Sequence, residues 1–170
     1  MDWIQTFTGR RFGVLHPDPD AVDIVDIAHS LSLLCRFNGH CSGFYSVAEH
    51  SVRVSKILPP ALALSGLLHD AAEAYVSDLP RPVKRQLGAF SDMEDRVLAV
   101  IFTRFGLALP LHEAVHHADD VLLATEKRDL MGDGAGSWGP LAEPLADRIL
   151  PLNPGEAERA FLARFGALTR

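Results

Sequence analysis

The stretch SGLLHDAAEAYVSDLPRPVK, residues 65–84, places a histidine and an aspartate side by side within an apolar run. Leucines and alanines point in nearly every direction around the helix predicted for residues 61–74, so we expect this helix to be buried on most sides. His69 and Asp70 project about 100° apart, and no single solvent-facing side exposes both. A buried carboxylate needs a partner or changes its protonation state. A shared metal ion would satisfy both side chains.

Two other predicted helices carry polar residues on their apolar sides in the same way. In SVAEHSVRVSKIL, residues 46–58, His50 falls on the valine and isoleucine side, whereas Glu49 lies on the opposite, charged side. In LHEAVHHADDVLLATEKRDL, residues 111–130, Asp119 falls beside the buried leucines and valine by helical spacing. We therefore expect both His50 and Asp119 to point into the protein.

The predicted ligand set holds two imidazoles and two carboxylates from three helices: His50, His69, Asp70 and Asp119. Such a set suits one divalent transition metal, Mn, Co, Fe, Ni or Zn, with positions left open for water. A lone histidine on an apolar face is usually a core residue with satisfied hydrogen bonds. The joint pattern favours a metal, because four inward polar groups without a shared ion would be unfavourable.

The rest of the chain predicts an all-α domain of about six or seven helices. Helix starts are predicted at five places: Ser46 with Glu49, Pro59-Pro60, Ser91 with Glu94, Pro110, and Asn153 with Glu156. Residues 1–20 are expected to be irregular or to form a short β-ribbon, and the Gly- and Pro-rich residues 132–144 to form a long loop. We expect one domain over residues 1–170, with its core at about 22–130.

Composition excludes several classes of protein. The 170 residues carry a net charge of -6, which argues against a nucleic-acid polymer as partner. Cys35 and Cys41 form no Cys-x-x-Cys pair, so we interpret them as free thiols. No apolar stretch is long enough to span a membrane, and the N-terminus lacks the order of a signal peptide. We therefore expect a cytoplasmic protein that acts on small molecules and not on membranes.

The order His50, His69-Asp70, Asp119 resembles the metal-binding signature of the HD-domain phosphohydrolase superfamily, carried by AEHS, LLHDAAEAY and HADDVL. Within it, HDAAEAYVSDLPRPVK resembles the bacterial 5'-deoxynucleotidases, and the similarity spans about residues 22–130. The segments DIAHSLSLLCRFNGH and FYSVAEHS resemble a further phosphohydrolase branch of this superfamily. The resemblance implies a helical HD-domain bundle, one divalent metal and a homodimer.

The resemblance also implies roles for individual residues. Glu73 matches the catalytic carboxylate, which moves a proton to or from the attacking water or the leaving oxygen. Asp78 matches the acidic residue that positions this water, and Arg36 matches the arginine that binds the substrate phosphate. His40 and Lys84 are weaker candidates for phosphate binding. The implied reaction converts (deoxy)nucleoside 5'-monophosphates to nucleosides and orthophosphate without a covalent intermediate.

Two alternatives stay open. Deoxynucleoside triphosphate triphosphohydrolases use the same ligand set, and a non-catalytic metal- or nucleotide-binding regulatory module would also retain it. Without the resemblance, Glu73 could be a helix-surface carboxylate, Asp78 a helix cap and Arg36 a loop residue. Two other branches lose weight: Glu73 is followed by Ala74 and not by an aspartate, unlike the guanosine-tetraphosphate hydrolases, and the chain lacks the Gly-Tyr-Pro of the cyclic-dinucleotide phosphodiesterases.

Overall fold

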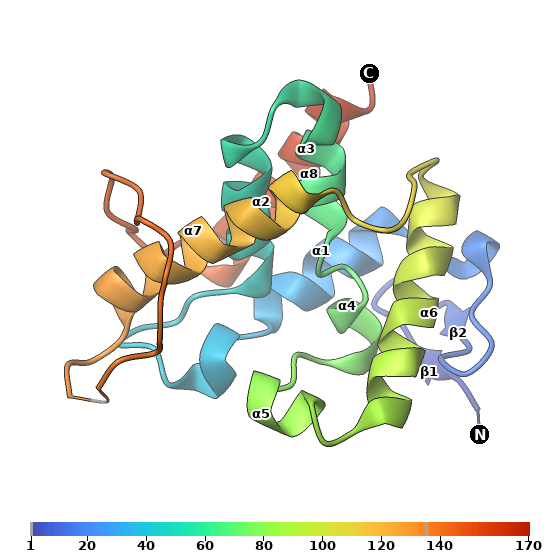
Figure 1. The fold of residues 1–170 in the computed structure, drawn as a ribbon. Helices are drawn as coiled ribbons and strands as arrows, with labels where there is room; N and C mark the ends of the chain where they lie inside the picture. Colours follow the sequence, from blue (N-terminus) through green and yellow to red (C-terminus); the bar gives the residue numbers. More distant parts are fainter. Residues whose placement is uncertain (1, 135) are drawn as a thin grey trace.

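Helices form most of the chain, preceded by a short β-ribbon (Figure 1), as predicted for an all-α protein. The structure is a computed structural model and describes residues 2–134 and 136–170. The helices are α1 (Ile24–Leu33), α2 (Val47–Ile57), α3 (Pro60–Leu68), α4 (Glu73–Val76), α5 (Arg81–Lys84), α6 (Gly88–Arg104), α7 (Glu113–Leu130) and α8 (Pro154–Leu168), with 3-10 turns η1 (Pro19–Ala21) and η2 (Arg36–Gly39). None of these helices has the length and apolar character that crossing a membrane requires.

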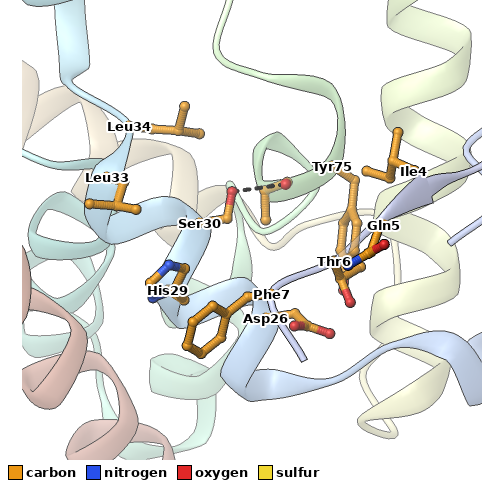
Figure 2. Close-up of a pocket in the computed structure, with 11 residues that line it drawn as sticks. Ile4, Gln5, Thr6, Phe7, Asp26, His29, Ser30, Leu33, Leu34 and Tyr75 are labelled. Atoms are coloured by element: carbon orange, nitrogen blue, oxygen red, sulfur yellow. Dashed lines mark hydrogen bonds between the residues drawn. The ribbon is translucent and has the colours of Figure 1, made fainter. Parts of the chain in front are cut away.

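The N-terminal ribbon confirms the expected β-structure. Strands β1 (Ile4–Gln5) and β2 (Arg11–Phe12) pair antiparallel. Phe12 is fully buried, and its ring stacks on Tyr75 of α4 with the centroids 3.8 Å apart. A hollow of about 380 Å³ lies between the ribbon, α1 and α4, lined by Phe7, His29 and Tyr75 among others (Figure 2). The ribbon therefore packs on α1 and α4.

Helix α2 lies at the centre of the packing, in contact with α1, α3, α7 and α8. On one side it joins the larger apolar core, which includes Leu31 of α1 and Phe161 of α8. On its other side Val54 packs with Val115 and Leu122 of α7. Full burial of each such side chain contributes on the order of 1.5–3 kcal/mol. These two contacts fix α2 against α7, and thereby the polar residues that both helices carry.

The helix predicted for residues 61–74 is interrupted, which is a correction. Helix α3 ends at Leu68, residues 69–72 form a tight turn, and α4 begins at Glu73. Within this turn the Glu73 N–H donates to the Asp70 carbonyl, three residues back instead of four. The His69 ring lies at this turn, where its Nδ1 donates to the Gly66 carbonyl at 2.9 Å. A continuous helix would offer that carbonyl to the backbone of Asp70.

Two predicted helix starts are wrong. Helix α6 begins at Gly88, so Ser91 lies inside the helix and caps nothing. Helix α7 begins at Glu113 and not at Pro110, and the ring Nδ1 of His112 accepts a hydrogen bond from a backbone N–H of its first turn. Both patterns are short, and a short pattern does not distinguish a helix start from an interior turn.

Two predicted capping boxes fare differently. The box at Asn153 and Glu156 is confirmed, with both reciprocal hydrogen bonds present at the start of α8. At α2 the Ser46 hydroxyl accepts from the Glu49 N–H, but the Glu49 side chain does not return the bond. Glu49 is instead buried and binds Arg53, one turn further along. Glu49 thus lies on the same side of α2 as Arg53, as predicted, but this part of the charged side is buried.

Candidate metal centre

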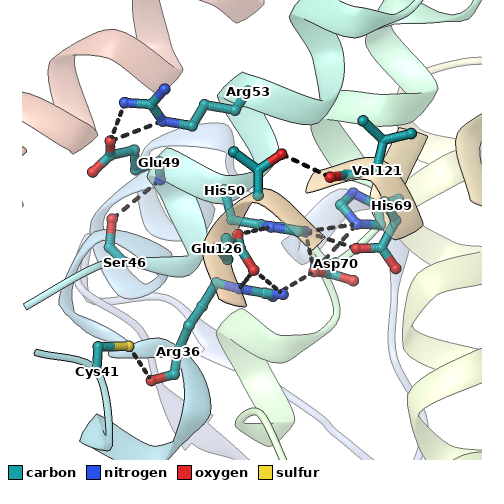
Figure 3. Close-up of polar contacts among 12 residues, drawn as sticks. Arg36, Cys41, Ser46, Glu49, His50, Arg53, His69, Asp70, Val121 and Glu126 are labelled. Atoms are coloured by element: carbon teal, nitrogen blue, oxygen red, sulfur yellow. Dashed lines mark hydrogen bonds and ion pairs between the residues drawn. The ribbon is translucent and has the colours of Figure 1, made fainter. Parts of the chain in front are cut away.

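The four predicted ligand residues come together between α2, α7 and the turn after α3. Figure 3 labels three of them, His50, His69 and Asp70. His50 Nε2 lies 3.3 Å from His69 Nε2, 3.2 Å from Asp119 Oδ1 and 3.5 Å from Asp70 Oδ2. His69 Nε2 lies 3.2 Å from Asp70 Oδ2. Ligand atoms of His50, His69 and Asp119 all lie within 4.8 Å of one another, so this group could hold a metal ion. We call the four residues the acceptor cluster.

The ring orientations explain why these atoms suit a cation. His69 Nδ1 donates to the Gly66 carbonyl, and His50 Nδ1 lies 2.6 Å from a carboxylate oxygen of Glu126. A neutral imidazole that donates through Nδ1 presents an unshared electron pair at Nε2. Both Nε2 atoms therefore present such pairs to each other and to the oxygens of Asp70 and Asp119. This concentration of acceptors fits a metal ion or a proton at the centre.

Without a metal, a proton on His50 takes that place. Burial and Arg36 lower the pKa of His50, but Glu126 and the hydrogen bonds with Asp119 and Glu126 outweigh them and raise that pKa to about 9. Burial raises the pKa of Asp119, yet the two histidines, His50 first, hold it well below its usual range. His50 is thus cationic at neutral pH in the metal-free protein. A metal binding here would displace the proton.

Glu126 is the residue that sequence reasoning missed. Its side chain is fully buried, with Oε1 on His50 Nδ1 at 2.6 Å and Oε2 on Arg36 Nε and Nη2 at 3.2 and 3.1 Å. Burial raises the pKa of Glu126, but Arg36 and His50 lower it further, so the carboxylate is ionised. A signal was present, because Glu126 lies two helical turns after Asp119 on the same face of α7.

A strained turn places Arg36 beside Glu126. Phe37 and Asn38 of η2 have φ of 54° and 53°, in the left-handed region that side chains rarely adopt. The Arg36 N–H donates to the Tyr45 carbonyl at 2.9 Å, which ties the base of this turn to the residues just before α2. The turn and this bond hold the guanidinium against α7.

One nitrogen of the Arg36 guanidinium, Nη1, is held less tightly than the other two. Nε and Nη2 both donate to Glu126, whereas Nη1 lies 3.6 Å from Asp70 Oδ2, beyond hydrogen-bond distance. Burial lowers the pKa of Arg36, but Glu126 and Asp70 outweigh it and keep that pKa above its ordinary value. Arg36 is therefore a permanent cation next to the acceptor cluster, and its phosphate role stays a prediction.

Glu73 and Asp78 add two further carboxyl groups. Glu73 begins α4, one turn after His69, and its Oε2 is buried with no hydrogen-bond partner among the described residues. Burial, then Asp70 and Asp78, raise the pKa of Glu73 well above its ordinary value. The pKa of Asp78 is also raised, chiefly by burial. A buried carboxyl group whose pKa is raised and whose oxygen lacks a partner among the described residues is a candidate for proton exchange.

Comparison with known proteins places the chain in a family. A scan against protein-family models finds no match. The chain is 43% identical over 173 residues to the uncharacterized protein YfdR of Escherichia coli K12, covering 99% of this chain and 97% of that protein. The chain belongs to the YfdR family. Another member, the uncharacterized protein RCAP_rcc00048 of Rhodobacter capsulatus, is 35% identical over 190 residues, covering 99% and 96% of the two chains.

The two weaker candidates for phosphate binding in this YfdR-family chain, Lys84 and His40, have different surroundings. Lys84 of α5 donates from Nζ to Glu94 of α6 at 2.8 Å. Burial lowers the pKa of Lys84, but Glu94, and after it the charges of Glu73 and Asp70, raise that pKa above its ordinary value. Lys84 therefore borders the acidic side of the centre while already paired. His40 is exposed and is not part of the group His50, His69 and Asp119 that could hold a metal. Their roles in substrate binding stay predictions.

Proposed function

We propose that this YfdR-family chain is a metal-dependent phosphohydrolase with an HD-domain fold, which hydrolyses (deoxy)nucleoside 5'-monophosphates to nucleosides and orthophosphate. The convergence of acceptor atoms from His50, His69, Asp70 and Asp119 carries the proposal. The helical fold and the chain order of these residues support the HD-domain assignment. An ionised arginine beside the cluster, and a buried Glu73 oxygen that has no hydrogen-bond partner among the described residues, support a phosphate substrate and proton transfer.

The acceptor cluster is the place for one divalent transition metal. Two imidazole nitrogens with carboxylate oxygens suit Mn, Fe, Co, Ni or Zn, and the acceptor-only chemistry of the converging atoms fits such an ion. When bound, the metal supplies a Lewis acid that lowers the pKa of water and neutralises charge on the phosphoryl oxygens. Second contacts at Nδ1 of both rings hold the Nε2 atoms toward it.

Arg36 binds the substrate phosphate. Its Nη1 is the donor that the bonds to Glu126 leave free, and it faces the cluster beside Asp70. A phosphate oxygen can accept from this N–H in a charge-assisted hydrogen bond. Because Glu126 fixes the other two nitrogens, the donor needs no reorganisation when the substrate enters.

Glu73 moves the proton. Its raised pKa allows the carboxylate to take a proton from the attacking water and to return it to the leaving nucleoside oxygen. Asp78, whose pKa is also raised, accepts a hydrogen bond from the same water and orients it. Water then attacks phosphorus as the bond to the 5'-oxygen breaks, giving orthophosphate and a nucleoside hydroxyl.

The test is orthophosphate release from deoxynucleoside 5'-monophosphates by purified protein loaded with Mn²⁺ or Co²⁺. We expect metal-dependent release that falls by at least about 100-fold in Asp119→Asn. Asp120→Asn is the matched control, because Asp120 is the exposed neighbour of Asp119 on α7 and should retain activity.

Three other outcomes contradict the proposal as stated. Release of inorganic triphosphate from deoxynucleoside triphosphates, with no activity on monophosphates, would replace the substrate class. Tight metal binding without hydrolysis of either class would indicate a non-catalytic binding module. Equal activity in wild type and Asp119→Asn would place the chemistry elsewhere in the chain.

A further inference from the structure

We infer that Glu126 is a shared positioning residue, which orients the metal ligand His50 with one oxygen and the phosphate-binding Arg36 with the other. This inference rests on the proposed function and adds a link within it. The metal ligand and the phosphate donor therefore both depend on this one carboxylate.

The division of the Glu126 oxygens carries the inference. Oε1 lies 2.6 Å from His50 Nδ1, and Oε2 accepts from Nε and Nη2 of Arg36 at 3.2 and 3.1 Å (Figure 3). The side chain is fully buried, so no water competes for either oxygen. Glu126 is the next inward carboxylate after Asp119 along this face of α7, which positions a ligand and its support on one rigid element.

Each oxygen has a separate task. At His50 the carboxylate holds the proton on Nδ1, which leaves Nε2 facing the other ligands and raises the basicity of the ring. At Arg36 two donors converge on one oxygen, which fixes the guanidinium plane and aims Nη1 at the cluster. Both tasks require an acceptor, and a carboxylate offers two.

An amide at this position can perform only one of the two tasks. Glutamine has one acceptor oxygen and one NH₂ group, so Glu126→Gln turns an N–H donor toward either His50 Nδ1 or Arg36. The amide N–H would then face another N–H donor in a buried site, where neither finds an acceptor. Such an arrangement is strongly destabilising. With Arg36 present, its charge competes for the amide oxygen, and the His50 side loses its support. Removal of Arg36 frees the amide oxygen for His50.

The experiment is a calorimetric titration of Mn²⁺ into metal-stripped protein, which requires no substrate. We expect Glu126→Gln to weaken Mn²⁺ binding by about 10–100-fold. Arg36→Met should retain wild-type affinity, because Glu126 still holds His50. The double variant Glu126→Gln with Arg36→Met should bind Mn²⁺ within about threefold of Arg36→Met alone. Recovery of Mn²⁺ affinity in the double variant would mean that His50 and Arg36 share the Glu126 carboxylate in the wild-type protein. A purely structural role of Glu126 does not predict this recovery.

Glu49→Gln is the matched control. Glu49 is as buried as Glu126 and is the residue before His50, but it binds Arg53 and the backbone of Leu152 outside the cluster. We expect its Mn²⁺ affinity to stay within about threefold of wild type. Thermal unfolding by circular dichroism establishes that each variant is folded.

The outcomes separate the inference from the proposed function. Unchanged Mn²⁺ affinity in Glu126→Gln, or equal losses in the single and double variants, would overturn the inference while wild-type metal binding stands. If wild-type protein binds no Mn²⁺, the proposed function fails and the inference fails with it. If Glu126→Gln alone does not fold, the double variant is compared with Arg36→Met: equal affinity supports the inference, and a loss of about tenfold or more overturns it.

Discussion

Two carboxylates of this protein, Glu49 and Glu73, are both buried, with 1% and 6% of their surface exposed, but their surroundings differ. Glu49 is saturated: Oε1 accepts two bonds from Arg53, and Oε2 accepts from the Leu152 N–H at 2.8 Å. Glu73 has an oxygen with no partner among the described residues and lies near other carboxylates. We call the region of Glu49, Arg53 and Leu152 the C-terminal clamp.

The difference shows how a buried carboxylate that stabilises the fold can be told from one that takes part in chemistry. A buried carboxylate with closed hydrogen bonds stabilises the fold, and here the clamp ties α2 to the segment before α8. A buried carboxylate with an open oxygen is unfavourable for stability and is retained where chemistry uses it. If this distinction holds, substitution of Glu73 should lower activity, whereas substitution in the C-terminal clamp should lower stability.

The largest expected effect is on turnover. Glu73→Gln keeps the shape of the side chain and removes its proton-exchanging group, so kcat should fall by about 10²–10⁴-fold. Mn²⁺ affinity should stay within about threefold, because Glu73 is outside the metal-binding group. Orthophosphate release and calorimetric titration measure the two quantities. Glu113→Gln, at the exposed start of α7, is the control. Undiminished turnover in Glu73→Gln would place Glu73 with the structural carboxylates.

A smaller effect is expected on the pH dependence of stability in metal-stripped protein. The folded pKa of His50 is about 9, above its ordinary value of 6.5, so the protonated form stabilises the fold. This stabilisation is fully present below pH 6.5 and is lost as the pH rises through 9. The difference corresponds to up to about 3 kcal/mol.

Urea unfolding between pH 6 and pH 9.5 measures this loss. Excess Mn²⁺ should oppose it, because the metal competes with the proton and binds more tightly as pH rises. His50→Gln is the control that should lack the His50 contribution. A flat profile for the metal-stripped wild type would show that the acceptor cluster is not held together by a proton.

The smallest effect concerns the C-terminal clamp. Arg53→Ala leaves Glu49 buried with only the Leu152 N–H as donor, which should lower the free energy of unfolding by about 2 kcal/mol. Mn²⁺ affinity of the folded variant should not change. Lys56→Ala, at an exposed position of the same helix, is the matched control for unfolding. A loss of metal affinity in Arg53→Ala would mean that the two regions are not separable.

Helical periodicity was sufficient to predict the all-α class and the inward placement of His50 and Asp119. It works there because each residue lies on a long face whose apolar neighbours are close in sequence. The same reasoning had the information for Glu126, two turns beyond Asp119. The flanking charged residues Lys127, Arg128 and Asp129 hide this signal, because a run of charges is typical of a solvent-exposed helix end.

Other features depend on contacts that no local pattern contains. Glu49 is buried because Leu152, 103 residues away, supplies a backbone donor. The helix is interrupted after Leu68 although the alanines that follow favour helix, and the His69 ring donates to the Gly66 carbonyl at this point. Sequence alone predicts the residue and not the turn that presents it.

The central claim, that the acceptor cluster binds one divalent metal, is tested most directly by equilibrium dialysis of metal-stripped protein against Mn²⁺, followed by elemental analysis. We predict about one Mn²⁺ per chain for wild type and for Asp120→Asn, and none retained by Asp119→Asn at the same free concentration. No retained metal in wild type, or equal metal content in Asp119→Asn, would contradict the assignment.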